Sequence, residues 1–316
     1  MKDTHLTGLW SNQDGPLIVR HDGQYIRLSD GIGWFESKNL IKALFPGEWT
    51  GYVSTTEDPN ELVWSDGGGS WNRMRDLTGT WVDHNDKAVE LAQNTTTKKV
   101  IGKGIHGMLN DQEVTLTTAQ GNLAGQLSNN DRLINWTNGA TWTRTPNCTG
   151  HWVVAQTQPA ISNIPGTGVQ AGTKVNLRQD ENNVISSQIT GVDSAFNVNG
   201  KLMPEKLTVT GNFPFGLGLG WLEHTSMSLQ WHANRFNRIM DVTGQWLDEK
   251  ENTITLEQTT PHPLKWPAVG TITSKEGQIG TIDRNWISLN GSDGICDLIT
   301  QEIHFTNGEK WTRLPG

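Results

Sequence analysis

Short stretches of alternating apolar and polar residues, separated by Gly, Asn, Asp and Thr, run along most of the chain. Turn residues recur every 8 to 12 positions, which is typical of all-β proteins, and no long window has an apolar stripe of helical period. The alternation is clearest at residues 79–83, 88–93, 99–106, 113–118, 122–128, 133–137 and 140–144. It returns at residues 253–258, 269–274, 278–283, 286–290, 302–306 and 309–313.

Two Asn-Gly pairs lie between such stretches, at Asn138-Gly139 and Asn307-Gly308. Asn-Gly suits a two-residue type I′ turn, in which both central residues have positive φ. The sequence therefore predicts antiparallel hairpins at these two points.

A repeated tryptophan motif divides the chain. Thr-Gly occurs eight times, and in four cases a Trp follows two residues after the Gly. The four opening tryptophans are Trp10, Trp81, Trp152 and Trp246. Chance placement of 15 tryptophans would give about 0.4 such cases, so the pattern indicates internal repetition.

A second motif closes each repeat with an aromatic residue followed two positions later by Arg. The closing aromatic residues are Trp71, Trp142, Phe236 and Trp311, and the next opening Trp follows ten residues later at all three junctions. The predicted units are residues 1–75, 76–146, 147–240 and 241–316. The third is longer, and we predict an inserted loop at about residues 155–200, which are rich in Pro, Gly, Asn and Gln.

Four tandem antiparallel β units of about 71 residues can be arranged in two ways. An open stack needs atypical polar end repeats, and none is visible, so we expect either a closed, propeller-like ring or small barrels packed together. The Gly-x-Trp of a first strand and the Arg of a last strand are similar to the strand ends of the lipocalin and avidin superfamily. That similarity covers about three residues at each end, a unit is short for an eight-stranded barrel, and no family is assigned.

Composition narrows the function classes. Apolar residues make up 34% of the chain and charged residues 18%, with a net charge of −8. No basic cluster of the kind that binds nucleic acid is present, and no apolar run could span a membrane. The first residues lack a signal-peptide apolar region, so a cytoplasmic location is the default expectation.

No motif indicates a metal or cofactor, so neither is predicted. Cys148 and Cys296 form neither a disulfide framework nor a zinc site, and we expect two ordinary buried thiols. Glu223 and His224, with His232 a strand later, are the weak catalytic candidates, because His titrates near neutrality.

The tryptophans separate into two groups. Those at repeated positions are expected to be framework, because every repeat needs a core. Those that do not repeat are better candidates for exposed binding platforms, namely Trp34, Trp49, Trp221, Trp266 and Trp286. Equivalent turns would present Asp66, Asn138, Asn234 and Asn307 at matched positions.

A surface rich in Asn, Asp, Thr, Gln and Trp suits neutral polyhydroxylated ligands. The sequence therefore favours a non-enzymatic, multivalent, lectin-like protein that binds carbohydrate-type ligands through Asp66, Asn138, Asn234, Asn307, Trp221, Trp266 and Trp286. One alternative is an enzyme or small-molecule carrier with one pocket at the divergent third unit. The other is a scaffold protein that docks partners.

Overall fold

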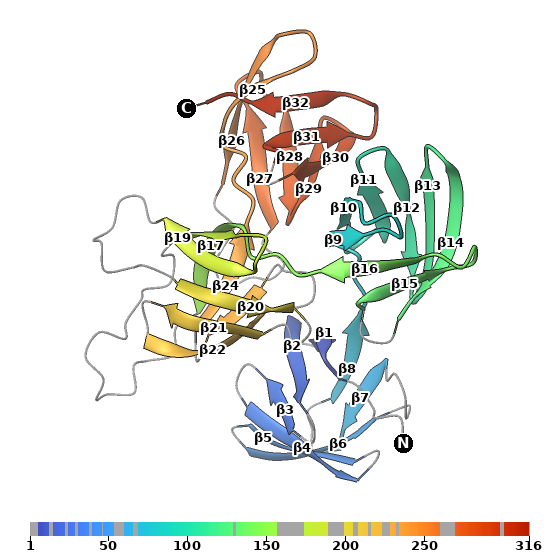
Figure 1. Cartoon of the computed structure of the whole chain (residues 1–316), viewed down its shortest axis with the longest axis vertical. Coiled ribbons are helices and arrows are strands. Elements are labelled where there is room, and N and C mark those ends of the chain that lie inside the picture. Colours follow the sequence, from blue (N-terminus) through green and yellow to red (C-terminus); the bar gives the residue numbers. More distant parts are fainter. Residues whose placement is uncertain are drawn as a thin grey trace.

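The chain folds into four closed antiparallel β-barrels of eight strands each (Figure 1). The structure is a computed structural model. It describes residues 6–12, 15–22, 25–28, 31–37, 40–45, 47–53, 60–65, 69–128, 131–156, 174–188, 199–204, 208–213, 216–222, 228–231, 234–259, 269–297 and 300–315.

Each barrel lies within one of the four predicted units. Barrel 1 consists of β1 (Gly8–Asn12), β2 (Gly15–Asp22), β3 (Tyr25–Leu28), β4 (Gly31–Ser37), β5 (Leu40–Phe45), β6 (Gly47–Val53), β7 (Glu61–Trp64) and β8 (Gly69–Met74). Barrel 2 consists of β9 (Gly79–Val82), β10 (Ala88–Gln93), β11 (Lys99–Gly102), β12 (Ile105–Asn110), β13 (Glu113–Thr118), β14 (Gly121–Leu127), β15 (Leu133–Trp136) and β16 (Thr141–Thr145).

The second half of the chain repeats this arrangement. Barrel 3 consists of β17 (Gly150–Gln156), β18 (Lys174–Gln179), β19 (Val184–Gln188), β20 (Asn199–Met203), β21 (Thr208–Phe213), β22 (Gly216–Leu222), β23 (Ser228–Trp231) and β24 (Asn234–Ile239). Barrel 4 consists of β25 (Gly244–Leu247), β26 (Thr253–Gln258), β27 (Val269–Ser274), β28 (Ile279–Asp283), β29 (Trp286–Leu289), β30 (Ser292–Asp297), β31 (Glu302–Phe305) and β32 (Lys310–Arg313).

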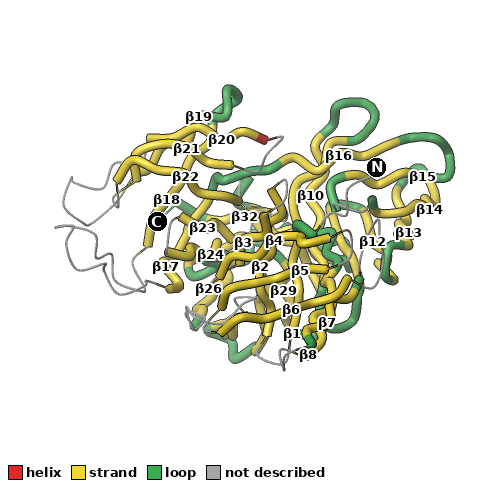
Figure 2. The backbone as a smooth tube through the Cα atoms, turned by 90° about the horizontal axis from the view of Figure 1, so that it is seen from below, coloured by secondary structure: helices red, strands yellow, loops and turns green. Residues whose placement is uncertain are grey.

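Every strand pairs with its neighbour in sequence, and the last strand of each barrel pairs with the first. Each sheet thus closes on itself, which confirms the all-β repeat prediction and selects packed barrels over the propeller-like ring. Strands and turns make up nearly all of the described chain (Figure 2).

No described segment forms a helix with the length and apolarity needed to cross a membrane.

Eight strands fit into about 70 residues because most strands have four to seven residues and many turns are very short. The expectation that a unit is too short for such a barrel was therefore wrong. The single strand predicted at 99–106 is two strands, β11 and β12, joined by a hairpin at Lys103-Gly104 in which Gly104 has φ of 66°. The prediction for barrel 4 also missed β30.

The predicted inserted loop at 155–200 was wrong as a single loop, because it contains β18 and β19 and the start of β20. Val175, Leu177 and Ile185 on β18 and β19 face the core of barrel 3. The polar residues around these three concealed the alternation. Residues 157–173 and 189–198 lie outside the described residues.

One tryptophan–arginine pair fills an end of each barrel. The opening tryptophans are at most 3% exposed, and each indole Nε1 donates to the backbone carbonyl four residues earlier at 2.8–2.9 Å. The Arg of the last strand lies over the indole, with its guanidinium carbon 4.3 Å from the ring centroid for Arg144 over Trp81 and 5.6–5.9 Å in the other barrels. The framework role predicted for the opening tryptophans is confirmed.

The same arginines also bond to the segment that leads into the first strand of each barrel. Arg144 donates to the carbonyls of Thr78 and Asp76, and to that of Asp131 at 2.8 Å. The Gly of each Thr-Gly-x-Trp motif has φ between 127° and 154°, a region that side chains rarely allow. A Cβ at Gly8 would lie 3.3 Å from the Arg73 guanidinium, so the motif needs glycine there.

A glutamine clamp that the sequence did not reveal completes the entry in barrels 2, 3 and 4. In barrel 2, the side-chain oxygen of Gln93 accepts from the Leu77 backbone amide at 2.8 Å, and its side-chain nitrogen donates to the Arg75 carbonyl at 3.2 Å. The backbone amide of Gln93 donates to the Thr78 hydroxyl. Gln179 and Gln258 make the corresponding bonds. In barrel 1, the His21 amide donates to the Thr7 hydroxyl at 3.0 Å.

A pair of aromatic rings packs edge to face inside three of the barrels. The ring centroids are 4.8–5.0 Å apart for Trp64–Trp71, Trp136–Trp142 and Phe305–Trp311. Edge-to-face contact is a favourable arrangement for two aromatic quadrupoles. The closing tryptophans are therefore framework residues too.

Barrel 2 packs on barrel 4 through a buried charged and apolar interface. Arg284 of barrel 4 pairs with Asp76 and donates to the Gln93 carbonyl at 2.7 Å. Beside it, Ala92 and Ile101 of barrel 2 pack against Trp286 and Ile295 of barrel 4. Burial alone would lower the pKa of Arg284, but Asp76 and Asp283 outweigh that effect and raise it.

Barrel 2 also contacts barrels 1 and 3. Arg75, in the segment from barrel 1, pairs with the buried Asp131 at 2.6 Å and with Asn60 at 3.0 Å. Arg132 donates to the Pro204 carbonyl of barrel 3 at 3.0 Å. Barrel 2 therefore connects to all three other barrels.

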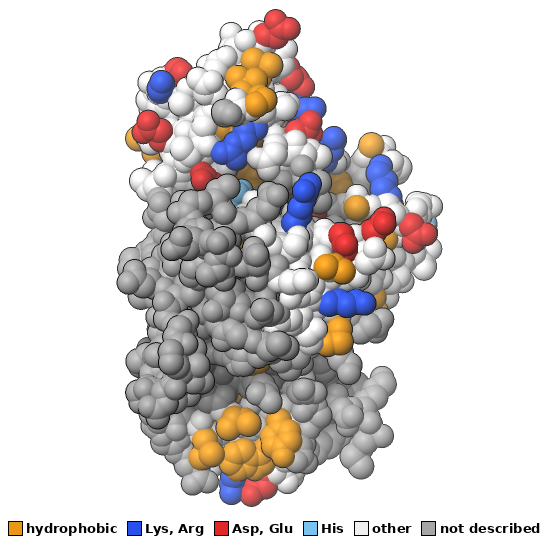
Figure 3. Space-filling model, turned by 60° about the vertical axis from the view of Figure 1, so that its left-hand side comes forward, with side chains coloured by type: hydrophobic (Ala, Val, Ile, Leu, Met, Phe, Trp, Pro, Cys, Tyr) orange, Lys and Arg blue, Asp and Glu red, His pale blue; other side chains and the backbone are white. Residues whose placement is uncertain are grey.

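Most large apolar side chains are buried in the barrel cores. Figure 3 shows one exception, a group of hydrophobic side chains gathered on the outside of barrel 1, at the lower end of the molecule.

We expect Arg144→Lys to lower the free energy of unfolding by about 2–4 kcal/mol, because lysine keeps the charge but cannot cover the indole and serve three buried carbonyls. Urea denaturation followed by tryptophan fluorescence measures this. Arg178→Lys, at an exposed arginine, is the matched control and should change stability by less than about 0.5 kcal/mol. Equal midpoints for Arg144→Lys and wild type would contradict the proposed closing role.

Candidate functional site

The two Asn-Gly tips are built as capped turns. The side-chain oxygens of Asn138 and Asn307 accept from the amides of Ala140 and Glu309, both at 3.0 Å. Only the glycines have positive φ, 86° at Gly139 and 92° at Gly308, so the predicted type I′ geometry was wrong. A type I turn followed by a left-handed glycine fits instead.

Other predicted site residues have different outcomes. Asn234 begins β24 opposite Trp231, and nothing is described of its side chain. Trp221 is half-buried on β22, so its role as a platform stays a prediction. The remaining predicted residues lie outside the described residues, namely Asp66, Glu223, His224, His232 and Trp266.

The prediction for Trp286 was wrong. It was predicted to be an exposed platform, but it is 2% exposed in the interface between barrels 2 and 4. Trp286 there packs against Ile101 of barrel 2. A ligand cannot reach its ring without separation of the two barrels.

The described residues contain no group of three or more His, Cys, Asp or Glu placed to hold a metal ion. Cys148 and Cys296 are buried free thiols, as predicted. Burial raises the pKa of Cys148 to about 12 and raises that of Cys296 as well, so neither thiol is poised as a nucleophile.

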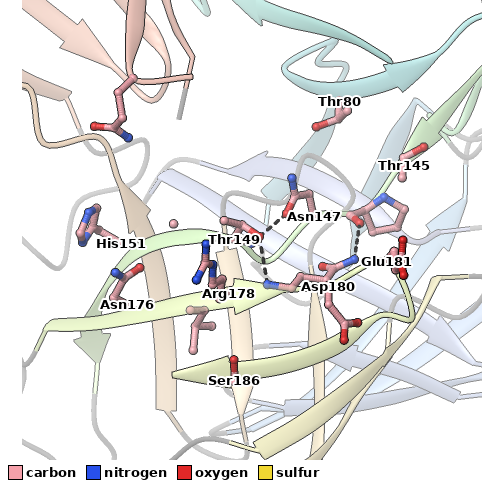
Figure 4. Close-up of a pocket in the computed structure, with 15 residues that line it drawn as sticks. Thr80, Thr145, Asn147, Thr149, His151, Asn176, Arg178, Asp180, Glu181 and Ser186 are labelled. Atoms are coloured by element: carbon pink, nitrogen blue, oxygen red, sulfur yellow. Dashed lines mark hydrogen bonds between the residues drawn. The ribbon is translucent and has the colours of Figure 1, made fainter. Parts of the chain in front are cut away.

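A polar groove of about 710 Å³ lies where barrels 2, 3 and 4 meet (Figure 4). One wall is the outer face of β17, β18 and β19, where His151 pairs with Asn176 and Arg178 pairs with Ser186 across strands. These side chains are exposed and offer imidazole, amide, guanidinium and hydroxyl groups.

The opposite wall belongs to barrel 2. Thr80 on β9 and Thr145 on β16 are cross-strand partners, and both line the groove. Gln301 of barrel 4 also contributes, and its side-chain oxygen accepts from Arg313 at 3.2 Å. The walls thus come from three barrels, so the internal repeat does not by itself generate four copies of this groove.

The floor of the groove is held by hydrogen bonds within the linker between barrels 2 and 3 and from β18 to that linker. The side-chain oxygen of Asn147 accepts from the Thr149 amide at 2.8 Å, and the Thr149 hydroxyl accepts from the Gln179 amide at 3.0 Å (Figure 4). Gln179 also donates to Asn183 at 2.9 Å. These bonds fix the floor before any ligand binds.

The rim carries charges of both signs. Asp180 and Glu181 lie in the turn after β18, next to Arg178. The Asp180 carboxylate accepts from the amides of Asn182 and Val184 at 2.9 and 2.8 Å, so it shapes the turn. Apart from His151, Arg178, Asp180 and Glu181, the residues that line the groove have no ionisable side chain.

Glu90 lies behind the Thr80 wall. Glu90 and Thr80 are cross-strand partners, and the Thr80 hydroxyl donates to the Glu90 carboxylate. Burial raises the pKa of Glu90, although Thr80 and Arg238 of barrel 3 oppose that shift. The electrostatic state of Glu90 thus depends on how barrels 2 and 3 meet.

The sequence offered one usable signal for this groove. Thr80 and His151 both occupy the variable third position of Thr-Gly-x-Trp, which points outward between inward-facing neighbours. At a repeated motif the shared positions serve the fold, so a position that varies among the repeats is a better candidate for function. Asn176 and Ser186 belong to no repeated motif, and no local pattern identifies them.

No protein-family model matches this chain, and no curated protein shows a significant sequence match to it.

We expect Glu90→Gln to flatten the pH dependence of stability as the pH rises above 4.5. The raised pKa means that the folded chain holds the proton more tightly, so Glu90 stabilises fully below its ordinary value of 4.5 and loses that contribution as pH rises through the raised value. Urea denaturation at several pH values measures this effect. Glu257→Gln, at an exposed strand position, should keep the wild-type curve, and the same curve for Glu90→Gln would contradict the prediction.

Proposed function

We propose that the protein binds neutral, polyhydroxylated ligands of carbohydrate type in the groove between barrels 2, 3 and 4, and that it does so without catalysis. The observation that carries this proposal is the lining: amide, hydroxyl and imidazole side chains on two facing walls above a hydrogen-bonded floor. Such groups give directional hydrogen bonds to sugar hydroxyls, and a fixed floor lowers the cost of ordering on binding.

The packing of the barrels argues against carriage of a ligand inside a barrel. Each interior is filled by the opening tryptophan, its arginine and, in three barrels, an edge-to-face aromatic pair. An eight-stranded barrel either is filled by side chains or holds one small ligand, and here side chains occupy the interior. A ligand therefore has to bind outside the barrels.

A single groove also means that avidity from four matched loop sites on one chain is no longer expected. The lectin-like prediction relied on matched loop tips, whereas Asn138 and Asn307 use their carbonyl oxygens to cap their own turns. We propose one groove per chain in place of four shallow loop sites.

A glycan array of neutral oligosaccharides, followed by calorimetric titration with the best-binding glycan, tests the proposal. We expect Asn176→Ala to weaken binding about tenfold, the effect of losing about 1.4 kcal/mol from one polar contact. The matched control is Asn138→Ala, which removes an exposed amide at a loop tip.

The two variants separate the two locations. Loss of binding in Asn138→Ala with full binding in Asn176→Ala would place the site at the loop tips. Failure of every neutral glycan to bind at millimolar concentration would contradict carbohydrate recognition altogether.

A further inference from the structure

Barrel 1 has an apolar outer face that has no counterpart among the described residues of the other barrels. Among the described residues, five of the eight exposed large hydrophobic side chains lie on it: Tyr25, Ile32, Leu44, Tyr52 and Val63. Barrels 2, 3 and 4 each expose one, namely Met108, Val184 and Ile279. We call the five residues of barrel 1 the apolar patch.

The apolar patch extends across β3 to β7, and the Lys42–Thr50 pair lies between Leu44 on β5 and Tyr52 on β6. Ile32 and Leu44 are direct partners on β4 and β5, and Tyr52 and Val63 are partners on β6 and β7. Tyr25 pairs with the half-buried Trp34. Figure 3 shows hydrophobic side chains side by side on this end of the molecule.

Barrel 4 has an apolar pair at the equivalent position, and there it is buried against another barrel. In both barrels a glycine of the sixth strand lies against the aromatic residue of the seventh, Gly51 against Trp64 and Gly294 against Phe305. The next residue on the sixth strand is therefore equivalent in the two barrels, Tyr52 in barrel 1 and Ile295 in barrel 4.

Their partners on the fifth strand are equivalent as well, because Leu40 pairs with Tyr52 and Trp286 pairs with Ile295. In barrel 4 this apolar pair is covered by the outer face of barrel 2, and each member is 2% exposed. In barrel 1, Tyr52 at the same position is 53% exposed.

We propose that the apolar patch of barrel 1 is a homodimer interface, which packs on the same patch of a second copy of this chain around a two-fold axis. Within the chain, the surface that covers this position is the outer face of another barrel of the same fold. The covering face of barrel 2 is already occupied by barrel 4. Of the described surfaces of a second copy, its own apolar patch is then the one with several exposed hydrophobic residues.

The charges on this face are also compatible with self-association. Lys42 on β5 pairs with Glu36 on β4 at 2.9 Å, so the face carries both signs next to the apolar residues. The Lys42–Glu36 pair by itself gives neither a polyanion nor a polycation a net attraction. A two-fold copy brings the same balanced pair.

Sedimentation velocity of the full chain between about 1 and 100 μM tests the proposal. We expect a monomer–dimer equilibrium in the wild type. Tyr52→Glu and Leu44→Glu should each raise the dimer dissociation constant at least about tenfold, because each places a charge in an apolar contact. Ile279→Glu, which alters the 70% exposed residue of barrel 4, should leave the constant unchanged.

Circular dichroism and thermal melting establish that the variants are folded. A wild type that stays monomeric throughout, or a folded Tyr52→Glu variant that dimerises as the wild type does, would overturn the proposal. Species larger than a dimer that grow with concentration would also overturn it, because a two-fold contact closes at two copies.

Discussion

The arginine that covers the opening tryptophan is the contact on which the rest of this structure depends. A closed barrel of about 70 residues has a narrow interior, and one indole at the chain entry fills much of it. The indole Nε1 bonds to a backbone carbonyl four residues earlier, and the arginine satisfies further carbonyls of the same entry segment. A single side chain from the last strand thus joins the two ends of the barrel, which explains why Trp and Arg recur in every unit.

The same requirement explains the spacing between units. The closing aromatic residue faces its barrel core, the Arg two positions later covers the indole, and the following Asp or Asn caps the Thr amide that begins the next barrel, as Asp76 does for Thr78 at 2.7 Å. The closing aromatic residue, the Arg and the capping residue of this ten-residue segment therefore each have a partner in one barrel or the next. An insertion would place the Arg or the cap out of reach.

The features that sequence predicts well are the ones that repeat or depend on local pattern. All-β structure, four units and framework tryptophans follow from alternation and spacing. The count of eight strands does not, because a two-residue turn such as Lys103-Gly104 interrupts an otherwise continuous β-prone stretch. Trp286 looks like a free platform in sequence and is buried by a neighbouring barrel, since its burial depends on contacts such as Arg284 with Asp76, 208 residues apart. The meeting of three barrels that forms the groove could not be predicted for the same reason, although the variable third position of Thr-Gly-x-Trp indicates two of its residues.

Filled interiors leave the outer faces as the place where the four barrels can differ in function. Equivalent positions show how far they have diverged: the outward residue after the sixth-strand glycine is Tyr52 in barrel 1 and Ile295 in barrel 4, one exposed and one buried in the chain's own interface. The third position of Thr-Gly-x-Trp is Thr80 in barrel 2 and His151 in barrel 3, and both face the groove. Substitutions at such positions leave the tryptophan–arginine pair intact, so a repeat can acquire an interface or a binding wall without loss of its core.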